Sequence, residues 1–254
     1  MRAALLPLLL VACQASADDA DLRPPFITTP DAVVERMLEL AGTRADDVVM
    51  DLGSGDGRIV IAAARKFGAR GIGIELSPPL VEESRRNARL AGVSDRVSFV
   101  QGDVLLADIS PASVVTLYLL PGLIGKLEPR FISELRPGTR IVAHGFAMAG
   151  WKPDRTEVMR IAQPHPGQGP ESRLFLWIVP AEVRGTWRVD GREVRIEQNY
   201  QQIDVSGAED ARLSGHEISW RSREGRFSGR VEGTRMSGEL VAPDGRRQAL
   251  FLTR

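Results

Sequence analysis

Residues Val48–Ala64 read VVMDLGSGDGRIVIAAA, and this stretch decides how the chain folds around a site. A short apolar run leads into a loop with glycines at 53, 55 and 57, and a helix-like stretch follows. Because glycine has no side chain, such a loop lets a ligand approach the backbone closely. The stretch predicts a β-strand, a tight turn and an α-helix with a ligand at the turn. The alternative is a tight connection that holds no ligand.

The spacing of the three glycines selects among possible ligands. A dinucleotide fingerprint reads G-x-G-x-x-G, but here the third glycine comes one residue early, and no Gly-Lys-Ser/Thr follows as in a P-loop. Asp51 stands two residues before Gly53, where a carboxylate would repel a pyrophosphate and attract a cationic amino group. S-Adenosylmethionine carries an ammonium and a sulfonium and no phosphate. The loop therefore favours this cofactor and disfavours an NAD-dependent oxidoreductase.

Two further acids follow the next two predicted strands. Glu75 ends the stretch GIGIEL, where an acid can accept both hydroxyls of a ribose. Asp103 follows in QGDV, where it can reach an adenine amino group with Val104 as an apolar neighbour, although an Asp that caps a turn is the alternative. Because ligands of such sheets bind at the carboxyl ends of the strands, Asp51, Glu75 and Asp103 are expected along one edge.

Strand-like and helix-like stretches alternate through the first part of the chain. We expect helices in TTPDAVVERMLELAG, capped by Thr29, in SPPLVEESRRNARLAG, capped by Ser77, and in part of PGLIGKLEPRFISELRPG, limited by Pro129. The alternation predicts an α/β domain over residues 26–180, a Rossmann-like parallel sheet with helices on both faces. After a boundary near Pro180, short strands and tight turns predict a small all-β module over residues 181–254.

The first 17 residues, MRAALLPLLLVACQASA, have the pattern of a signal peptide: one Arg, a short apolar core and small residues. Two cleavage sites compete. LVAC resembles a lipobox that would lipidate Cys13, the single cysteine of the chain, and ASA resembles an ordinary signal-peptidase site. Residues 18–25 are expected to form a linker. The chain is expected to be exported, periplasmic or lipid-anchored if the signal is used, and cytoplasmic if it is not.

The side of the site that would receive a substrate gives weaker signals. The fourth strand ends in TLYLLP, without the Asn/Asp-Pro-Pro-Tyr/Phe motif of enzymes that methylate amide or adenine nitrogens. Tyr118 is the candidate catalytic residue, because it can orient an amine, and a core tyrosine is the alternative. His144 can accept a proton, but a packed histidine is the favoured interpretation. The three histidines lack metal-ligand spacing, so no metal site is predicted.

The motifs DLGSGDGR, GIELSP and QGD, in this order, resemble those of class I S-adenosylmethionine-dependent methyltransferases. PFITTPDAVVERML, VVTLYLLP and HGFAMAGWKPD further resemble a mitochondrial protein-lysine methyltransferase family that acts on the ATP synthase c-subunit and the adenine nucleotide translocase. The resemblance covers about residues 25–179. It implies S-adenosylmethionine as cofactor and a lysine of a membrane protein as substrate. Motifs and resemblance together predict a cofactor site made of Thr28, Thr29, Asp51, Gly53, Ser54, Gly55, Asp56, Glu75, Leu76, Asp103 and Val104.

The expected function is methyl transfer from S-adenosylmethionine to a protein lysine. The alternatives are a small-molecule methyltransferase on the same fold and an exported noncatalytic binding protein, because this cofactor is made in the cytoplasm. A protein partner is expected, and any membrane attachment would run through Cys13. The formal net charge of zero gives no indication of a nucleic-acid partner.

Overall fold

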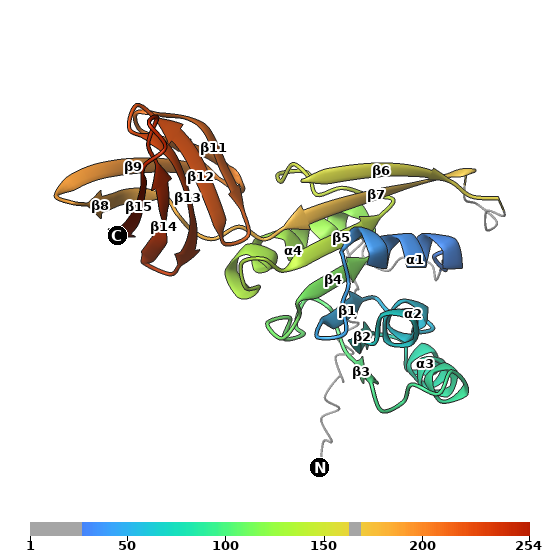
Figure 1. The fold of residues 1–254 in the computed structure, drawn as a ribbon. Helices are drawn as coiled ribbons and strands as arrows, with labels where there is room; N and C mark the ends of the chain where they lie inside the picture. The colour runs from blue at the N-terminus through green and yellow to red at the C-terminus, as the bar shows by residue number, and fades with distance from the viewer. Residues whose placement is uncertain (1–26, 163–168) are drawn as a thin grey trace, which may run out of the picture.

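A computed structural model of the chain describes residues 27–162 and 169–254, which form two β-sheets in separate lobes (Figure 1). The proposed signal peptide, Cys13 and the linker over residues 18–25 lie outside the described residues. The elements of the first lobe are α1 (Asp31–Leu40), β1 (Val48–Leu52), α2 (Arg58–Phe67), β2 (Arg70–Glu75), α3 (Pro78–Leu90), β3 (Val97–Gln101), β4 (Val114–Leu117), α4 (Pro121–Glu134), β5 (Arg140–His144), β6 (Arg155–Arg160) and β7 (Glu171–Ile178).

The sheet of the first lobe has the strand order β3-β2-β1-β4-β5-β7-β6. Its first five strands pair in parallel, as the alternating pattern predicted. The expectation of a wholly parallel sheet is wrong at one edge, because β7 runs antiparallel to both β5 and β6. No helix separates β5 from β6 or β6 from β7 in the described residues, and a parallel pairing would need such a crossover.

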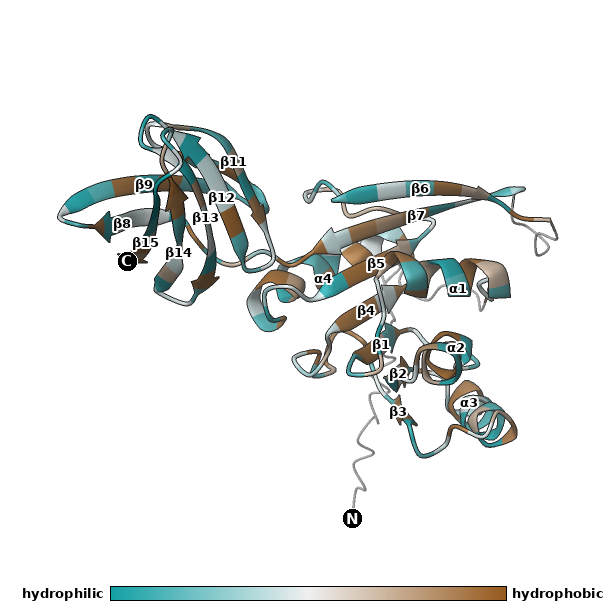
Figure 2. Cartoon of the chain, viewed as in Figure 1, coloured by the Kyte–Doolittle hydropathy of each residue, from teal (hydrophilic) through white to brown (hydrophobic). Residues whose placement is uncertain are grey.

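Helices cover both faces of this sheet, as expected. Apolar side chains of α1, α2 and α3 pack with Val49, Val114 and Val142 on one face. On the other face, α4 packs with Met50, Val115 and other alternate residues of the same strands. Successive side chains of a strand point to opposite faces, so a strand buried on both sides is apolar throughout. Figure 2 shows the central strands in brown for this reason.

Two helix predictions need correction. Thr29 does not cap α1: Pro30 occupies that position, and the Thr29 hydroxyl contacts the ring of His144 instead. Pro129 does not limit α4, which continues from Pro121 to Glu134. Proline removes one backbone hydrogen bond, but the side chains of Leu127 and Phe131 on either side of it are fully buried. Their packing keeps the helix intact, because tertiary contacts override local propensity.

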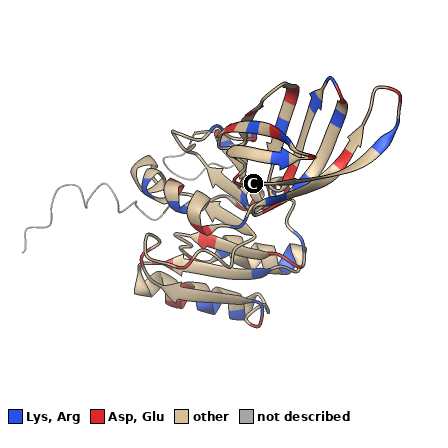
Figure 3. Cartoon of the chain, turned by 90° about the vertical axis from the view of Figure 1, so that its left-hand side faces the viewer, with Lys and Arg blue, Asp and Glu red and all other residues tan. Residues whose placement is uncertain are grey.

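The second lobe is the all-β module. Its strands are β8 (Gly185–Val189), β9 (Arg192–Asn199), β10 (Gln202–Val205), β11 (Ala208–Ser214), β12 (Glu217–Ser222), β13 (Gly225–Glu232), β14 (Arg235–Val241) and β15 (Arg247–Thr253). They form one antiparallel sheet in the order β10-β9-β8-β15-β14-β13-β12-β11. Only residues 206–207 separate β10 from β11, the two ends of this order, so the sheet must curl round. Its inner face is a packed core that includes Trp187 and Phe227. Figure 3 shows both signs of charge spread over its strands.

The module is docked on the first lobe through the turn between β9 and β10. The ring of Tyr200 stacks on Trp151 with centroids 5.1 Å apart and 5° between the planes. Its hydroxyl donates to Glu128 Oε1 of α4 at 2.8 Å, and burial together with this carboxylate raises the pKa of Tyr200 to about 12. Gln201 accepts a hydrogen bond from Trp151 Nε1 at 2.7 Å. The predicted boundary at Pro180 lies in the connection between β7 and β8, whose Val183 is fully buried. The module therefore packs against α4 and the segment around Trp151.

Candidate active site

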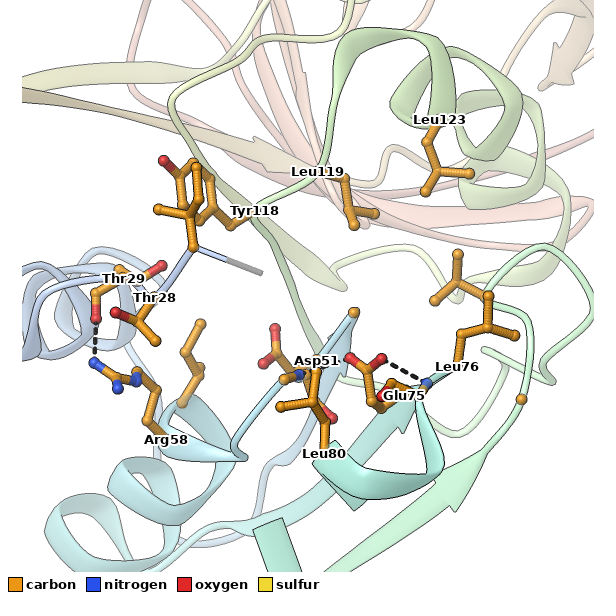
Figure 4. A pocket seen from close by; sticks show the side chains of 18 of the residues that line it. Thr28, Thr29, Asp51, Arg58, Glu75, Leu76, Leu80, Tyr118, Leu119 and Leu123 are labelled. Atoms are coloured by element: carbon orange, nitrogen blue, oxygen red, sulfur yellow. Dashed lines mark hydrogen bonds between the residues drawn. The ribbon is translucent and has the colours of Figure 1, made fainter. Parts of the chain in front are cut away.

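A cavity of about 620 Å³ lies at the carboxyl ends of β1, β2, β3 and β4. This volume falls within the roughly 300–1,000 Å³ of small-molecule sites. Figure 4 shows Asp51 near its middle, Glu75 and Leu76 toward one end, and Thr28, Thr29 and Tyr118 at the other. All of the predicted site residues except Asp56 line it: Thr28, Thr29, Asp51, Gly53, Ser54, Gly55, Glu75, Leu76, Asp103, Val104 and Tyr118.

The glycine loop forms the floor of the cavity and is tied to the neighbouring strand. The amides of Gly53 and Ser54 both donate to the carbonyl of Ile74 at 2.9 Å. The three loop glycines have φ values of 84°, 52° and 81°, which residues with a side chain rarely adopt. The glycines thus serve the backbone conformation as well as the close approach of a ligand.

Asp51 is a buried acid at the end of β1, with 3 % of its surface exposed. Its Oδ1 accepts a hydrogen bond from Thr116 Oγ1 at 2.7 Å. Burial, with the nearby carboxylates of Asp56 and Glu75 adding to it, raises the pKa of Asp51 to about 7. Within residues 27–162 and 169–254 no basic side chain forms an ion pair with it. A buried carboxylate beside two others is stabilised when a cation is bound, so the site fits a cationic ligand.

Glu75 and Asp103 are each oriented by backbone amides. Glu75 Oε2 accepts from the amide of Gly55 at 2.9 Å and Oε1 from that of Ser77 at 2.8 Å. Each oxygen keeps a second lone pair for a ligand hydroxyl. Asp103 Oδ1 accepts from the amide of Leu105 at 2.8 Å, which is the turn-capping alternative, and its side chain also lines the cavity. The hydrogen bond to Leu105 confirms the turn cap, and contact with an adenine amino group stays a prediction.

Asp56 is the one predicted site residue that lies outside the lining of the cavity. Its carboxylate faces Arg58, with Nη2 2.6 Å from Oδ2, and does not line the cavity. Arg58 does line it, and its Nη1 donates to the carbonyl of Thr29 at 2.9 Å. This guanidinium ties the segment before α1 to the start of α2. Sequence reasoning missed Arg58 because an Arg in a first helical turn carries no signal of a partner 29 residues upstream.

Most apolar residues of the cavity wall were not predicted. Leu76 is an exception: it was predicted, and it is 55 % exposed at the rim of the cavity. Five others come from the elements that follow the motifs, namely Ile59, Leu80, Leu105, Leu119 and Leu123. In the sequence they look like ordinary core residues, and only the fold brings them to one wall.

The remaining end of the cavity is made by Thr28, Thr29 and Tyr118. The Tyr118 ring packs against His144, with centroids 4.2 Å apart. His144 is 3 % exposed, and burial lowers its pKa to about 4. Its Nδ1 lies 3.3 Å from Thr29 Oγ1, and its Nε2 lies 2.8 Å from Ser172 Oγ of β7. The favoured interpretation of His144 as a packed residue agrees with these contacts.

The described residues contain no group of three or more His, Cys, Asp or Glu side chains placed to hold a metal ion. Among the same residues, no helix has the length and apolar character needed to cross a membrane. The polar side chains among the residues that line the cavity are those of Thr28, Thr29, Asp51, Ser54, Arg58, Glu75, Ser77, Asp103 and Tyr118.

Known proteins resemble this chain in both sequence and structure. The model of the ANTKMT methyltransferase domain family matches residues 51–155. A protein-lysine N-methyltransferase of Saccharolobus islandicus is 44% identical over 138 residues, which cover 54% of this chain and 84% of that protein. The lysine N-methyltransferase of the ATP synthase c-subunit from Mus musculus is 37% identical over 132 residues, and the match spans 52% of this chain and 53% of that protein.

A solved structure extends the likeness to the cofactor. The crystal structure of an RNA methyltransferase from Salinibacter ruber in complex with S-adenosyl-L-homocysteine is 52% identical, with a TM-score of 0.55. The match covers 62% of this chain and 96% of that one. S-Adenosylmethionine is accordingly the cofactor whose charge and hydroxyl groups the cavity fits. The chain belongs to the family of S-adenosylmethionine-dependent protein-lysine N-methyltransferases.

Proposed function

We propose that this protein transfers a methyl group from S-adenosylmethionine to the side chain of a lysine in a protein substrate. The observation that carries the proposal is the buried carboxylate of Asp51, which has no basic partner among the described residues and lies between the glycine loop and Glu75. The similarity to a protein-lysine N-methyltransferase over 84% of that protein's length supports the choice of acceptor.

The strand order supports an assignment of the parts of the cofactor to residues. From the edge inward, Asp103 follows β3, Glu75 ends β2, Asp51 is the penultimate residue of β1, and Tyr118 follows β4. Asp103 and Glu75 would hold the adenine amino group and the ribose hydroxyls, and Asp51 would face the cationic end. When bound, S-adenosylmethionine supplies a methyl group on a positively charged sulfur. The acceptor is then expected at the β4 side, where Tyr118 lines the cavity. Thr28 and Thr29, which the sequence predicted for the cofactor site, line the same end, and we propose that they face the acceptor.

The acceptor amine must arrive without its proton, since only the lone pair can attack carbon. With an ordinary lysine pKa of about 10.4, losing that proton at pH 7 costs about 5 kcal/mol. Apolar walls such as Leu119 and Leu123 favour the neutral amine by desolvation. His144 is not placed to act as the base, because it is buried and does not line the cavity, and the same burial lowers its pKa. The residues of this chain therefore act by orienting the amine and excluding water.

RNA methylation is the second candidate, favoured by the similarity to a protein described as an RNA methyltransferase. Proteins that bind RNA usually present clustered basic residues to the phosphates. Here the charges sum to zero, and Lys and Arg alternate with Asp and Glu over the surface (Figure 3). This balance favours the protein substrate.

One labelling experiment separates the candidates. The purified chain is incubated with S-adenosylmethionine carrying a radioactive methyl group and with a cell extract, and the product is digested with protease or with ribonuclease. We expect label in methyl-lysine after acid hydrolysis, sensitive to protease and absent with Asp51→Asn. Label that only ribonuclease releases would establish RNA as the acceptor, and label in compounds of low mass would establish a small molecule.

We further propose that residues 1–17 direct export, because their charge and apolar core match a signal peptide. Fusion of an alkaline phosphatase reporter after residue 25 is expected to give activity outside the cytoplasm. Cys13→Ala is expected to release the reporter from membranes if LVAC is used as a lipobox, and to change nothing if cleavage follows ASA. A reporter that is inactive in both forms would contradict export.

A further inference from the structure

One side chain supports two of the three polar residues at the acceptor end of the cavity, Thr29 and Tyr118. His144 ends β5, one strand beyond Tyr118, and does not itself line the cavity. Its ring packs against the Tyr118 ring, and its Nδ1 contacts the Thr29 hydroxyl. These two contacts join segments that are far apart in the sequence, and they meet at a residue that solvent does not reach.

We propose that His144 is a positioning residue that fixes Thr29 and Tyr118 where the acceptor amine must be aligned. The proposal rests on the proposed methyl transfer and concerns its acceptor end alone. A neutral imidazole has one donor and one acceptor, and hydroxyls can play either part, so the contacts to Thr29 and Ser172 form together. Ser172 belongs to β7, and it anchors the ring to the sheet.

Thr29 is held from two sides. His144 contacts its hydroxyl at 3.3 Å, and Arg58 Nη1 donates to its carbonyl at 2.9 Å. The short segment before α1 thereby stays over the cavity although its residue 30 is a proline, which has no amide to donate. Loss of the His144 contact removes one of the two supports and also leaves one face of the Tyr118 ring without its packing partner.

The same geometry excludes two other roles. His144 is not itself a cofactor ligand, because it does not line the cavity in which Asp51, Glu75 and Asp103 lie. It is not a base for the amine, because it is buried behind Tyr118 and Thr29 and its pKa is lowered to about 4. Its effect must therefore appear in the methyl-transfer step and leave cofactor binding alone.

Two variants separate the contacts. His144→Phe keeps an aromatic ring against Tyr118 and loses both hydrogen bonds, and His144→Asn keeps hydrogen-bonding groups and loses the ring. The matched control is His216→Phe, since His216 is a half-buried histidine whose ring also makes a hydrogen bond, in this case to the Val231 carbonyl in the β module. Titration calorimetry gives the Kd of S-adenosylmethionine, and labelling of an acceptor protein gives kcat and KM.

For both His144 variants we expect the Kd of S-adenosylmethionine to stay within about threefold and kcat to fall on the order of 10- to 100-fold, because small misplacements cost that much in aligned reactions. The pH profile of the remaining activity should keep the shape of the wild type. His216→Phe should behave as wild type. Cofactor affinity that falls in step with kcat, or a low-pH limb of the profile that vanishes with His144, would overturn the proposal.

Hydrogen exchange tests the positioning role of His144 without an acceptor, so its result does not depend on which molecule is methylated. In the full chain saturated with S-adenosylmethionine, His144→Phe should speed exchange at the amides of Thr28 and Thr29 and leave residues 53–57 unchanged. If the wild-type chain methylates no lysine but His144→Phe still produces this change in exchange, the proposed function is refuted and the positioning role is supported. Unchanged exchange at Thr28 and Thr29 would refute the positioning role.

Discussion

The two ends of the cavity are built in different ways. At the cofactor end, acidic side chains are fixed by backbone amides: Glu75 by those of Gly55 and Ser77, and Asp103 by that of Leu105. At the acceptor end, the fixing is done by side chains: His144 and Arg58 hold Thr29, and the ring of His144 packs against Tyr118.

The difference decides how each end responds to change. Every substitution except proline keeps the backbone amide, so the cofactor end depends mainly on its own acids and glycines. A side-chain support can be removed by one substitution, so the acceptor end can adapt to other substrates while cofactor binding persists. The predictions below test this division, beginning with the largest expected effect.

Asp51→Asn is expected to weaken S-adenosylmethionine binding by at least about 100-fold, because it removes a buried charge opposite the cationic ligand. The same change should stabilise the unliganded protein at pH 8, since a neutral amide is buried more easily than a carboxylate. Calorimetric titration and thermal unfolding measure the two effects. Equal affinity in variant and wild type would show that Asp51 does not face the cofactor.

Tyr200→Ala should lower the free energy of unfolding by about 3 kcal/mol, through lost stacking on Trp151 and an unpaired Glu128 carboxylate. Because Gly145, which follows β5 on the way to Trp151, lies beside the Tyr118 ring, kcat should fall more than cofactor affinity. Tyr200→Phe, which loses only the hydrogen bond, is the control, and denaturant unfolding is the measurement. A stability equal to that of wild type would mean that the module is not docked as described.

Gly57→Ala tests the backbone of the cofactor end. At Gly57 an added Cβ would lie 2.6 Å from Phe99 Cε1 at a φ of +81°. Gly92→Ala is the control, since its φ is +70° and nothing lies within 4 Å of an added Cβ. The left-handed conformation costs both variants about 1–2 kcal/mol, and overpacking adds about 1–3 kcal/mol at Gly57 alone. Thermal unfolding should therefore show a larger loss of stability for Gly57→Ala than for Gly92→Ala. Cofactor binding should weaken only for Gly57→Ala.

The pH dependence follows from the pKa of about 7 for Asp51, against about 3.9 in the unfolded chain. The folded state binds this proton more tightly, so the group's contribution to stability is complete below about pH 4 and is lost as pH rises through 7. Cofactor affinity runs the opposite way, because the cation needs the carboxylate. It should be about tenfold weaker at pH 6 than at pH 8, and Asp51→Asn should abolish this difference. Affinity that is flat over this range would contradict the assignment.

Asp56→Asn should have the smallest effect, because its carboxylate faces Arg58 and not the cavity. We expect the Kd of S-adenosylmethionine to change by less than about threefold, which matches the modest worth of a partly exposed ion pair. Glu75→Gln is the contrasting variant from the adjacent strand. A loss with Asp56→Asn as large as that with Glu75→Gln would restore Asp56 to the cofactor site.

Sequence patterns predicted the cofactor end because its information is local. The run from Val48 to Ala64 contains the strand, the loop, most of the helix and Asp51. Two further acids, Glu75 and Asp103, each stand at the end of one of the next two predicted strands. The same patterns could not predict that His144 contacts Thr29, 115 residues away, or that Tyr200 completes the packing around Trp151. Such contacts depend on how distant elements meet. The errors at Thr29 and Pro129 arose likewise, since tertiary contacts replaced the local preferences for a cap and a helix end.

The most direct test of this account is a calorimetric titration of the purified chain with S-adenosylmethionine at pH 8. The structure predicts saturable binding with one site per chain, together with competition by S-adenosylhomocysteine and no competition by NAD. Absence of heat and of competition up to millimolar cofactor would contradict the assignment of the cavity and with it the proposed methyl transfer.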